Sequence, residues 1–133
     1  MQKGFATLEV ILMVMVIGIL ASIAVPRFNT VTANANTARI QADLSTIDTA
    51  IAIYYMEKGT YPENLSDLTD YLRGADGDLK PPTGKCYMNN STDPVDVPGT
   101  AYTIKAASGN DEARAILGGN DNTVEKFHKK TTT

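Results

Sequence analysis

The chain has 133 residues, which is enough for one compact domain with appended segments. A formal net charge of −3 at pH 7 argues against a general phosphate-binding surface, because such a surface needs clustered excess Lys and Arg. Cys86 is the only cysteine, so no intramolecular disulfide can form, and one cysteine with one histidine provides too few ligands for a structural zinc site.

Residues 5–25 form an apolar stretch of helix-competent residues, FATLEVILMVMVIGILASIAV. A helix needs about 20 apolar residues to span a bilayer, so this stretch predicts a transmembrane helix. Lys3 precedes the stretch and Arg27 follows it, so charge alone does not set its orientation. A plain membrane anchor fits this pattern, and so does a secretory signal peptide cut after residues 22–24, Ser-Ile-Ala.

One charged residue, Glu9, interrupts the apolar stretch and follows Gly4 and Phe5 at a defined spacing. In KGFATLEVILMVMVIGILASIAVPRF the sequence resembles the type IV pilin superfamily, which includes pilus subunits and the pseudopilins of type II secretion and competence systems. The resemblance implies that a leader, residues 1–4, is cut off between Gly4 and Phe5, and that the new amino terminus of Phe5 is methylated. The chain has Phe-Ala-Thr-Leu-Glu where the family more often has Phe-Thr-Leu-Ile-Glu, a departure that leaves the glycine, phenylalanine and glutamate in place.

The charge of Glu9 needs compensation, because an ionised side chain near a membrane core costs free energy. Cleavage after Gly4 would give Phe5 a mostly protonated α-amine. In a filament packed through these helices, that amine can pair with Glu9 of a neighbouring subunit, which offsets both charges and fixes the axial register. The alternative is that Glu9 lies in the first helical turn near the lipid headgroups, where the helix dipole favours it.

Gly18 and Pro26 are the weak points of the predicted N-terminal helix. Pro26 cannot donate a backbone hydrogen bond to the carbonyl near Ser22, so it tends to kink the helix. The resemblance implies that the helix unwinds locally between Gly18 and Pro26 during filament assembly. A packing glycine and a simple kink at the membrane surface are the alternative.

The helical pattern continues beyond Pro26 with apolar residues spaced four, three, four and three apart, which is typical of one face of an amphipathic helix. These residues are Ile40, Leu44, Ile47, Ile51 and Tyr54. Gly59 and Pro62 predict the end of the helix. We therefore expect one long helix over about residues 5–58, whose apolar stripe packs against a globular head. The Gly-Thr-Tyr-Pro turn at 59–62 adds to the resemblance, and Tyr61 is expected to pack at that turn.

The remaining residues, 59–133, predict a small head with few regular elements. Asn64 and Asp67 are placed to cap a short helix, and residues 73–99 are rich in Gly, Pro, Asn and Asp, which indicates loops with one short strand at 85–88. The stretches TAYTIKAA (100–107) and ARAIL (113–117) flank a turn and predict a β-hairpin. The tail EKFHKKTTT shows no core pattern. The expected fold class is α+β and pilin-like, with a small antiparallel sheet against the C-terminal half of the long helix.

Several motifs fail to predict a catalytic or cofactor site. PPTGKC lacks both the spacing and the following Ser or Thr of a phosphate-binding loop, and no nucleophile, base and oxyanion site come together around Cys86 or His128. Because major pseudopilins often bind calcium in their C-terminal loops, the resemblance makes candidate ligands of Asp111, Glu112 and Asp121, with a solvated turn as the alternative. The basic residues 128–130, His-Lys-Lys, are a candidate DNA contact, with a solvated tail as the alternative.

The sequence thus predicts a structural subunit rather than an enzyme, with no cofactor and no small-molecule substrate. Its expected parts are the leader 1–4, a transmembrane and filament-core helix 5–27, an amphipathic half-helix 28–58 and the head 59–133. The resemblance implies a single-pass precursor in the inner (cytoplasmic) membrane, which contacts lipid, a prepilin peptidase and the membrane assembly machinery. It then polymerises with copies of itself into a periplasmic or extracellular filament, namely a pilus, a secretion pseudopilus or a competence filament. The alternative is a monomeric binding protein, anchored in the membrane or secreted, that forms no filament.

Overall fold

The computed structural model describes residues 2–72, 79–119 and 122–131. The chain divides into two compact units, Met1–Val31 and Thr32–Thr133. One long helix, α1 (Gln2–Lys58), forms all of the first unit that is described and contributes its second half to the second unit. The α+β fold class and the single long helix predicted from the sequence are confirmed.

Helix α1 ends where the sequence predicted. Gly59 adopts a φ of +73°, a left-handed conformation that L side chains rarely adopt, and its N–H donates to the carbonyl of Tyr55 at 2.8 Å. The chain then turns back, and the ring of Tyr61 stacks on that of Tyr55 with centroids 4.3 Å apart. This stacking confirms the predicted role of Tyr61 as a packing residue at the turn.

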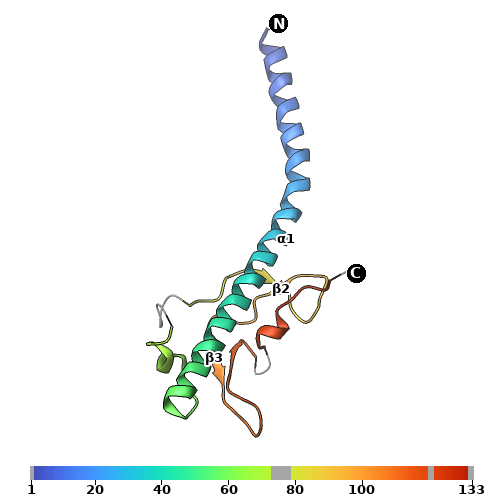
Figure 1. Ribbon diagram of the computed structural model, residues 1–133. Coiled ribbons are helices and arrows are strands. Elements are labelled where there is room, and N and C mark those ends of the chain that lie inside the picture. The colour runs from blue at the N-terminus through green and yellow to red at the C-terminus, as the bar shows by residue number, and fades with distance from the viewer. Residues whose placement is uncertain (1, 73–78, 120–121, 132–133) are drawn as a thin grey trace. The chain divides into compact units, whose positions relative to one another are not determined.

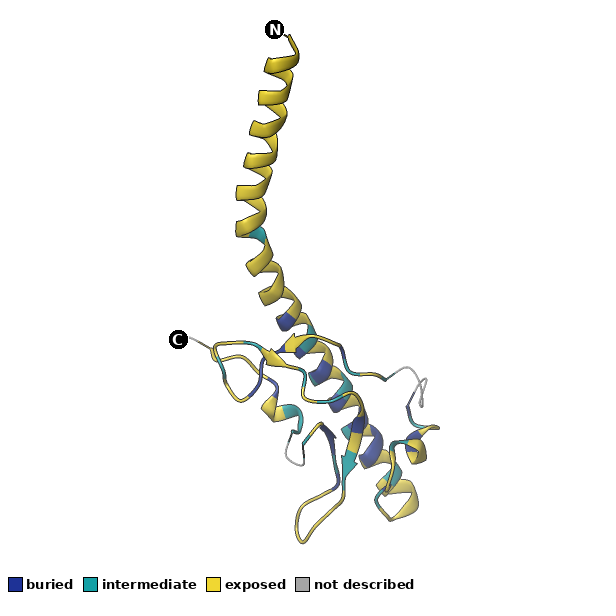
Figure 2. Cartoon of the chain, turned by 180° about the vertical axis from the view of Figure 1, so that it is seen from behind, coloured by how far each residue is buried: buried dark blue, intermediate teal, exposed yellow. Residues whose placement is uncertain are grey.

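The second half of α1 supplies one wall of the hydrophobic core. The predicted stripe is confirmed, because Ile40, Leu44, Ile47 and Ile51 are buried and Tyr54 packs against the same core. From the head, the core receives side chains of the strands and loops, namely Leu68, Leu72, Cys86, Met88, Tyr102, Ala113, Ala115, Leu117 and Phe127. Figure 2 shows these buried positions along the part of α1 that the head covers.

The strands form two short antiparallel pairs against α1 (Figure 1). Strand β3 (Tyr102–Lys105) pairs with β4 (Arg114–Leu117), which confirms the predicted hairpin. Strand β1 (Lys85–Cys86) is shorter than the strand predicted at 85–88, and it pairs with β2 (Val95–Asp96), which the sequence analysis did not predict. Pro94 and Pro98 flank β2 closely, and prolines at this spacing are typical of a loop. The sequence pattern therefore does not indicate a strand of two residues.

Two short 3₁₀-helices complete the head. Helix η1 (Leu65–Leu68) lies where the short helix was predicted, and the carboxylate of Asp67 accepts hydrogen bonds at 3.0 Å from the N–H groups of Glu63 and Asn64. Helix η2 (Val124–Lys126) precedes the C-terminal residues.

The tail, which shows no core pattern in the sequence, contributes to the core in the structure. Phe127 is completely buried, the side-chain amide of Gln41 donates to the Phe127 carbonyl, and the Lys126 carbonyl accepts from Asn89 N–H at 2.7 Å. The ammonium group of Lys129 lies 5.0 Å from the ring centre of Tyr87. A single aromatic residue among polar neighbours has no periodicity, so sequence pattern alone could not reveal this anchor.

Polar side chains of α1 hold successive segments of the head in order along the helix. Towards its middle, Asn36 donates to the carbonyls of Thr83 and Lys85, and Thr37 accepts from the N–H of Tyr87. Further along, the contacts run from Arg39 to the Lys80 carbonyl, from the Tyr102 hydroxyl to Asp43, from Ala115 N–H to Asp48, and from the Tyr71 hydroxyl to Glu57. The head is therefore anchored along nearly the whole buried length of the helix.

We predict that Phe127→Ala lowers the free energy of unfolding of the head by about 3–4 kcal/mol, because it leaves a cavity in a fully buried site. The measurement is denaturant unfolding of the full chain in detergent, followed by near-ultraviolet circular dichroism of its tyrosines. His128→Ala, at the exposed neighbouring position, is the control and should change the free energy by less than about 0.5 kcal/mol. Equal effects of the two variants would contradict the anchoring role of Phe127.

Candidate functional site

The first unit is an exposed apolar helix surface. We call residues 5–31 of α1 the N-terminal apolar segment. Its large apolar side chains are all exposed: Phe5, Leu8, Val10, Ile11, Leu12, Met13, Val14, Met15, Val16, Ile17, Ile19, Leu20, Ile23, Val25, Phe28 and Val31. Figure 2 shows the helix exposed along this stretch. Among the described residues, α1 is the one helix long and apolar enough to cross a membrane. Such a surface requires lipid or another protein to cover it.

The predicted processing residues lie together at the start of this segment. Phe5 is 71% exposed, and Glu9, four residues later, lies on the same helical face. No described residue forms an ion pair or a side-chain hydrogen bond with Glu9. Within the chain, this carboxylate therefore has no compensating charge among the residues described. Cleavage after Gly4, methylation of Phe5 and the assembly role of Glu9 stay predictions.

Helix α1 runs without interruption through Gly18 and Pro26. A Cβ atom added at Gly18 would meet no atom within 4 Å, so Gly18 is not required for packing within the chain. Near Pro26 two hydroxyls bond to backbone carbonyls: Ser22 donates to Ile19 at 2.7 Å, and Thr30 to Pro26 at 3.4 Å. Neither bond reaches the carbonyl of Ser22, which is the acceptor that loses its helical donor because Pro26 has no N–H. The predicted unwinding concerns the assembled state and stays a prediction.

The head contains a charged cluster that the sequence analysis missed. The Nε and one terminal nitrogen of Arg114 both lie 3.0 Å from Asp48 Oδ2, and a terminal nitrogen lies 2.8 Å from Glu125 Oε1. Asp48 Oδ1 also accepts from the N–H of Ala115 at 2.7 Å. Hydrogen bonds from Thr123 and Arg114 lower the pKa of Glu125 to about 2. The cluster ties β4 and η2 to α1. In the sequence, the one indication of this cluster is the charged residue Asp48, which lies beside the apolar stripe of α1.

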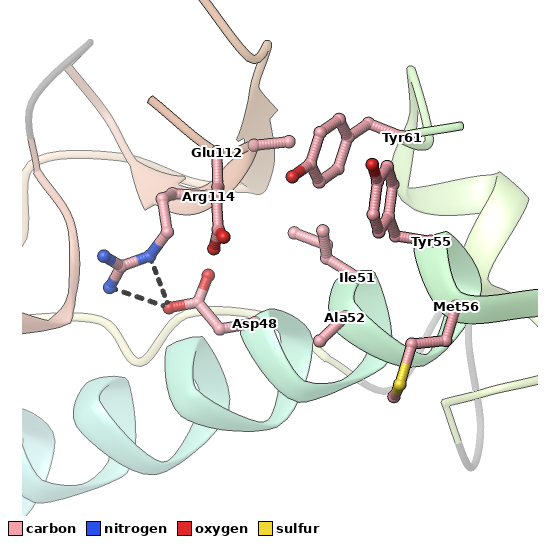
Figure 3. A pocket seen from close by; sticks show the side chains of 9 residues that line it. Asp48, Ile51, Ala52, Tyr55, Met56, Tyr61, Glu112 and Arg114 are labelled. Carbon is pink, nitrogen blue, oxygen red and sulfur yellow. Dashed lines mark hydrogen bonds and ion pairs between the residues drawn. The ribbon is translucent and has the colours of Figure 1, made fainter. Parts of the chain in front are cut away.

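Next to this cluster lies a pocket of about 410 Å³ between the end of α1 and the residues that lead into β4 (Figure 3). Ile51, Ala52 and Met56 give it an apolar floor, and the stacked rings of Tyr55 and Tyr61 form one side. The carboxylates of Asp48 and Glu112 lie on the opposite side. Arg114 also lines the pocket, so the pocket combines aromatic rings with two carboxylates and one guanidinium.

The structure places two of the three candidate calcium ligands next to each other. Asp111 exchanges backbone hydrogen bonds of 3.0 and 3.1 Å with Ser108, and Glu112 borders the pocket described above. Asp121 lies outside the described residues. Within 2–72, 79–119 and 122–131, no three acidic, histidine or cysteine side chains group closely enough to hold a metal ion. Calcium binding stays a prediction.

The remaining sequence candidates do not form a reactive site. Cys86 is completely buried, and loss of water around its thiol raises its pKa, which favours the unreactive protonated form. Of the basic residues 128–130, Lys129 lies over the Tyr87 ring, and all three are exposed. A contact of these residues with DNA stays a prediction.

Comparison with known proteins identifies related chains. The family model described as type II secretion system protein G matches residues 28–131. The type IV major pilin protein PilE1 of Neisseria gonorrhoeae is 33% identical over 64 residues, which cover 48% of this chain and 39% of that protein. The type IV narrow pilus major component PilA5 of Thermus thermophilus is 43% identical over 51 residues (38% and 44%). The type II secretion system core protein G of Klebsiella pneumoniae is 30% identical over 61 residues (46% and 44%).

The chain spans less than half the length of these curated relatives. No solved structure matches the chain. The family model covers most of the second unit and therefore includes the charged cluster and the pocket. The printed names of the relatives describe pilus and secretion-system components, and none describes an enzyme.

We predict that the contribution of Glu125 to stability depends on pH with a defined sign. Its pKa in the folded chain is about 2, below the value of about 4.3 expected when unfolded, so its stabilisation is present above pH 5 and is lost as the pH falls towards 2. Glu125→Gln should therefore lower the free energy of unfolding by about 0.5–1 kcal/mol at pH 7, the range for an exposed charge pair.

The measurement is thermal or urea unfolding of both chains between pH 2 and pH 7. Glu63→Gln, an exposed acidic residue outside the cluster, is the matched control and should show no such pH-dependent difference. A difference between the parent and Glu125→Gln that stays constant over this pH range would contradict the prediction.

Proposed function

The chain belongs to the family of type II secretion system protein G, and from this we propose that it is a structural subunit of a pilus-like filament that polymerises through the N-terminal apolar segment. The curated relatives include pilus subunits and a secretion-system core protein, so the proposal is the filament class that these proteins share. The subunit is made as a precursor, is cut between Gly4 and Phe5, and is methylated at the new amino terminus of Phe5.

The observation that carries this proposal is the contrast between the two halves of α1. Its second half buries an apolar stripe against the head, whereas its first half exposes large apolar side chains on every face. Full burial of one such side chain contributes about 1.5–3 kcal/mol, so covering the segment supplies ample free energy for association. A bilayer can cover it in the precursor, and neighbouring helices can cover it in a filament.

The membrane therefore serves as the store from which subunits are assembled. We place the precursor in the inner (cytoplasmic) membrane as a single-pass protein, in contact with lipid, a prepilin peptidase and the assembly machinery. Assembly exchanges helix–lipid contacts for helix–helix contacts and delivers the head to the periplasmic or extracellular side. The apolar contacts supply affinity, but they are similar along the helix and do not define its axial position.

Glu9 supplies that axial position. After cleavage, the α-amine of Phe5 is mostly protonated at neutral pH. Pairing this amine with Glu9 of a neighbouring subunit removes two uncompensated charges from a low-dielectric filament core. A polar pair within an apolar interface is also the best-attested means of fixing register. The helix geometry supports this role, because Phe5 and Glu9 share an exposed face.

The first test is the mass and N-terminal sequence of the protein recovered from its native membrane or filaments. We expect a chain that starts at Phe5 and carries one added methyl group. A start at Val25 would indicate an ordinary secreted protein, and a start at Met1 would indicate a plain membrane anchor. Either of these two results would contradict the proposed processing.

The second test replaces Glu9 with Gln, which keeps the side-chain size and removes the charge. We expect the variant to accumulate in the membrane, with filament recovery reduced at least about tenfold, because the Phe5 amine then enters the core unpaired. The measurement is the sheared filament fraction relative to total protein in cells with the assembly machinery. Thr7→Val, two residues away on the exposed segment, is the control and should assemble normally. Unchanged filament recovery in Glu9→Gln would eliminate the pairing.

A further inference from the structure

The pocket at the end of α1 has an uncompensated negative charge. No described residue forms an ion pair or a side-chain hydrogen bond with Glu112, which borders the pocket. Asp48 and Glu125 both pair with the guanidinium of Arg114, and Lys105 and Asp111 line an adjoining hollow together with Glu112. Loss of water and then the charge of Glu112 raise the pKa of Tyr61, so the field of Glu112 reaches the aromatic side of the pocket.

This composition fits the side chain of a lysine. A lysine has a long apolar stem and a compact ammonium group. The stem matches the apolar floor of Ile51, Ala52 and Met56, of which Met56 is 76% exposed. The ammonium group would lie beside the carboxylate of Glu112, on the side of the pocket opposite the stacked rings of Tyr55 and Tyr61. An acidic ligand would instead be repelled by the carboxylate of Glu112.

The head also carries opposite charge at its two ends along α1. The segments held near Asn36 and Thr37 carry mostly basic residues, and the segments around Tyr55 carry mostly acidic ones. At the first end lie Lys80, Lys85, Lys129 and Lys130, against Asp93 and Asp96. At the second end lie Asp48, Glu57, Glu63, Asp67 and Glu112, against Lys58, Lys105 and Arg114. The rise of an α-helix separates Thr37 from Tyr55 by about 27 Å.

Opposite charges at opposite ends favour a head-to-tail contact between copies of the chain. Such a contact joins two different surfaces, so after each copy is added one basic end and one acidic end of the assembly stay uncovered. A contact of this kind propagates into an open helical assembly when its rotation does not close a ring. On this basis, which rests on the proposed filament function, we propose that the pocket receives the Lys130 side chain of a second copy of this chain.

Lys130 is a basic residue at this end whose side chain is available for a contact. Its backbone N–H donates to the Ser91 carbonyl at 3.1 Å, which fixes its position at the basic end. No described residue forms an ion pair or a side-chain hydrogen bond with Lys130, and the residue is exposed. By contrast, Lys129 lies over the Tyr87 ring of its own chain, and Lys85 lies 3.6 Å from Asp96. Lys130 is therefore free to reach a neighbouring copy.

The test uses filaments assembled from an equal mixture of unlabelled and ¹⁵N-labelled full-length chains. A carbodiimide joins a carboxylate to an amine in direct contact, and mass spectrometry then identifies the joined peptides. We expect a peptide pair that contains Glu112 and Lys130, in which half of the pairs combine one labelled and one unlabelled chain. The proposal is overturned if the filaments form but Glu112 is joined to no lysine, or only to lysines of its own chain.

A charge exchange provides a second, functional readout. Glu112→Lys and Lys130→Glu should each lower filament recovery about fivefold, the equivalent of losing one charge pair per interface, and the double variant should restore it. The matched controls make the same charge changes outside the proposed contact, as Glu63→Lys at the acidic end and Lys80→Glu at the basic end. These should have less than half the effect of the pocket variants. Equal effects of all four single changes would overturn the specific site and leave only a general charge effect.

Failure of this inference is distinguishable from failure of the proposed function. If the unaltered chain forms no filaments in electron micrographs, the proposed function fails first. If filaments form and Glu112→Lys assembles as well as the parent, only the pocket contact fails. Near-ultraviolet circular dichroism of each variant checks that the head is folded, and Glu112→Gln provides a milder change that removes the charge without reversing it.

Discussion

The second half of α1 is the element on which the structure of the head depends. The strands are only two and four residues long and occur in separate pairs, so they cannot form a stable layer by themselves. The apolar stripe of Ile40, Leu44, Ile47 and Ile51 gives them a common surface on which to pack. A hydrogen bond donated by Asn36, and hydrogen bonds accepted by the side chains of Thr37, Asp43 and Asp48, then fix each segment at its own level. The helix therefore acts as the scaffold, and the head consists largely of loops arranged along it.

The absence of a disulfide is offset by the way in which the last residues bind. Phe127 fills the core, Glu125 joins the cluster of Asp48 and Arg114, and the backbone of Lys126 and Lys130 bonds to the turn around residues 89–91. These contacts join the end of the chain to α1 and to the middle of the head without a covalent bond. Burial of an aromatic side chain and partly buried charge pairs together supply a few kcal/mol, which is comparable with one disulfide.

The sequence predicts the parts of the structure that depend on periodicity and on turn chemistry. The long helix, its buried stripe, its end at Gly59 and the hairpin of β3 and β4 all follow from local patterns. The tail anchor at Phe127 and the charged cluster around Arg114 do not, because each depends on which distant segments meet in space. The same reason explains why the pocket is absent from the sequence interpretation: Tyr55 and Glu112 are far apart in the chain and each, taken alone, resembles an ordinary surface residue.

The two halves of α1 separate affinity from direction in the proposed assembly. The N-terminal apolar segment provides a large surface whose contacts are similar at many axial positions, so it favours association without choosing one arrangement. In this proposal the charges determine the arrangement. Glu9 does so within the segment, and the oppositely charged ends of the head do so outside it. An interface that joins a basic end to an acidic end gives the assembly a direction, because two basic ends or two acidic ends repel each other. Every subunit added in this way points in the same direction as the one before it. A chain with a symmetric head would gain the same apolar contacts but would lose this distinction between parallel and antiparallel addition.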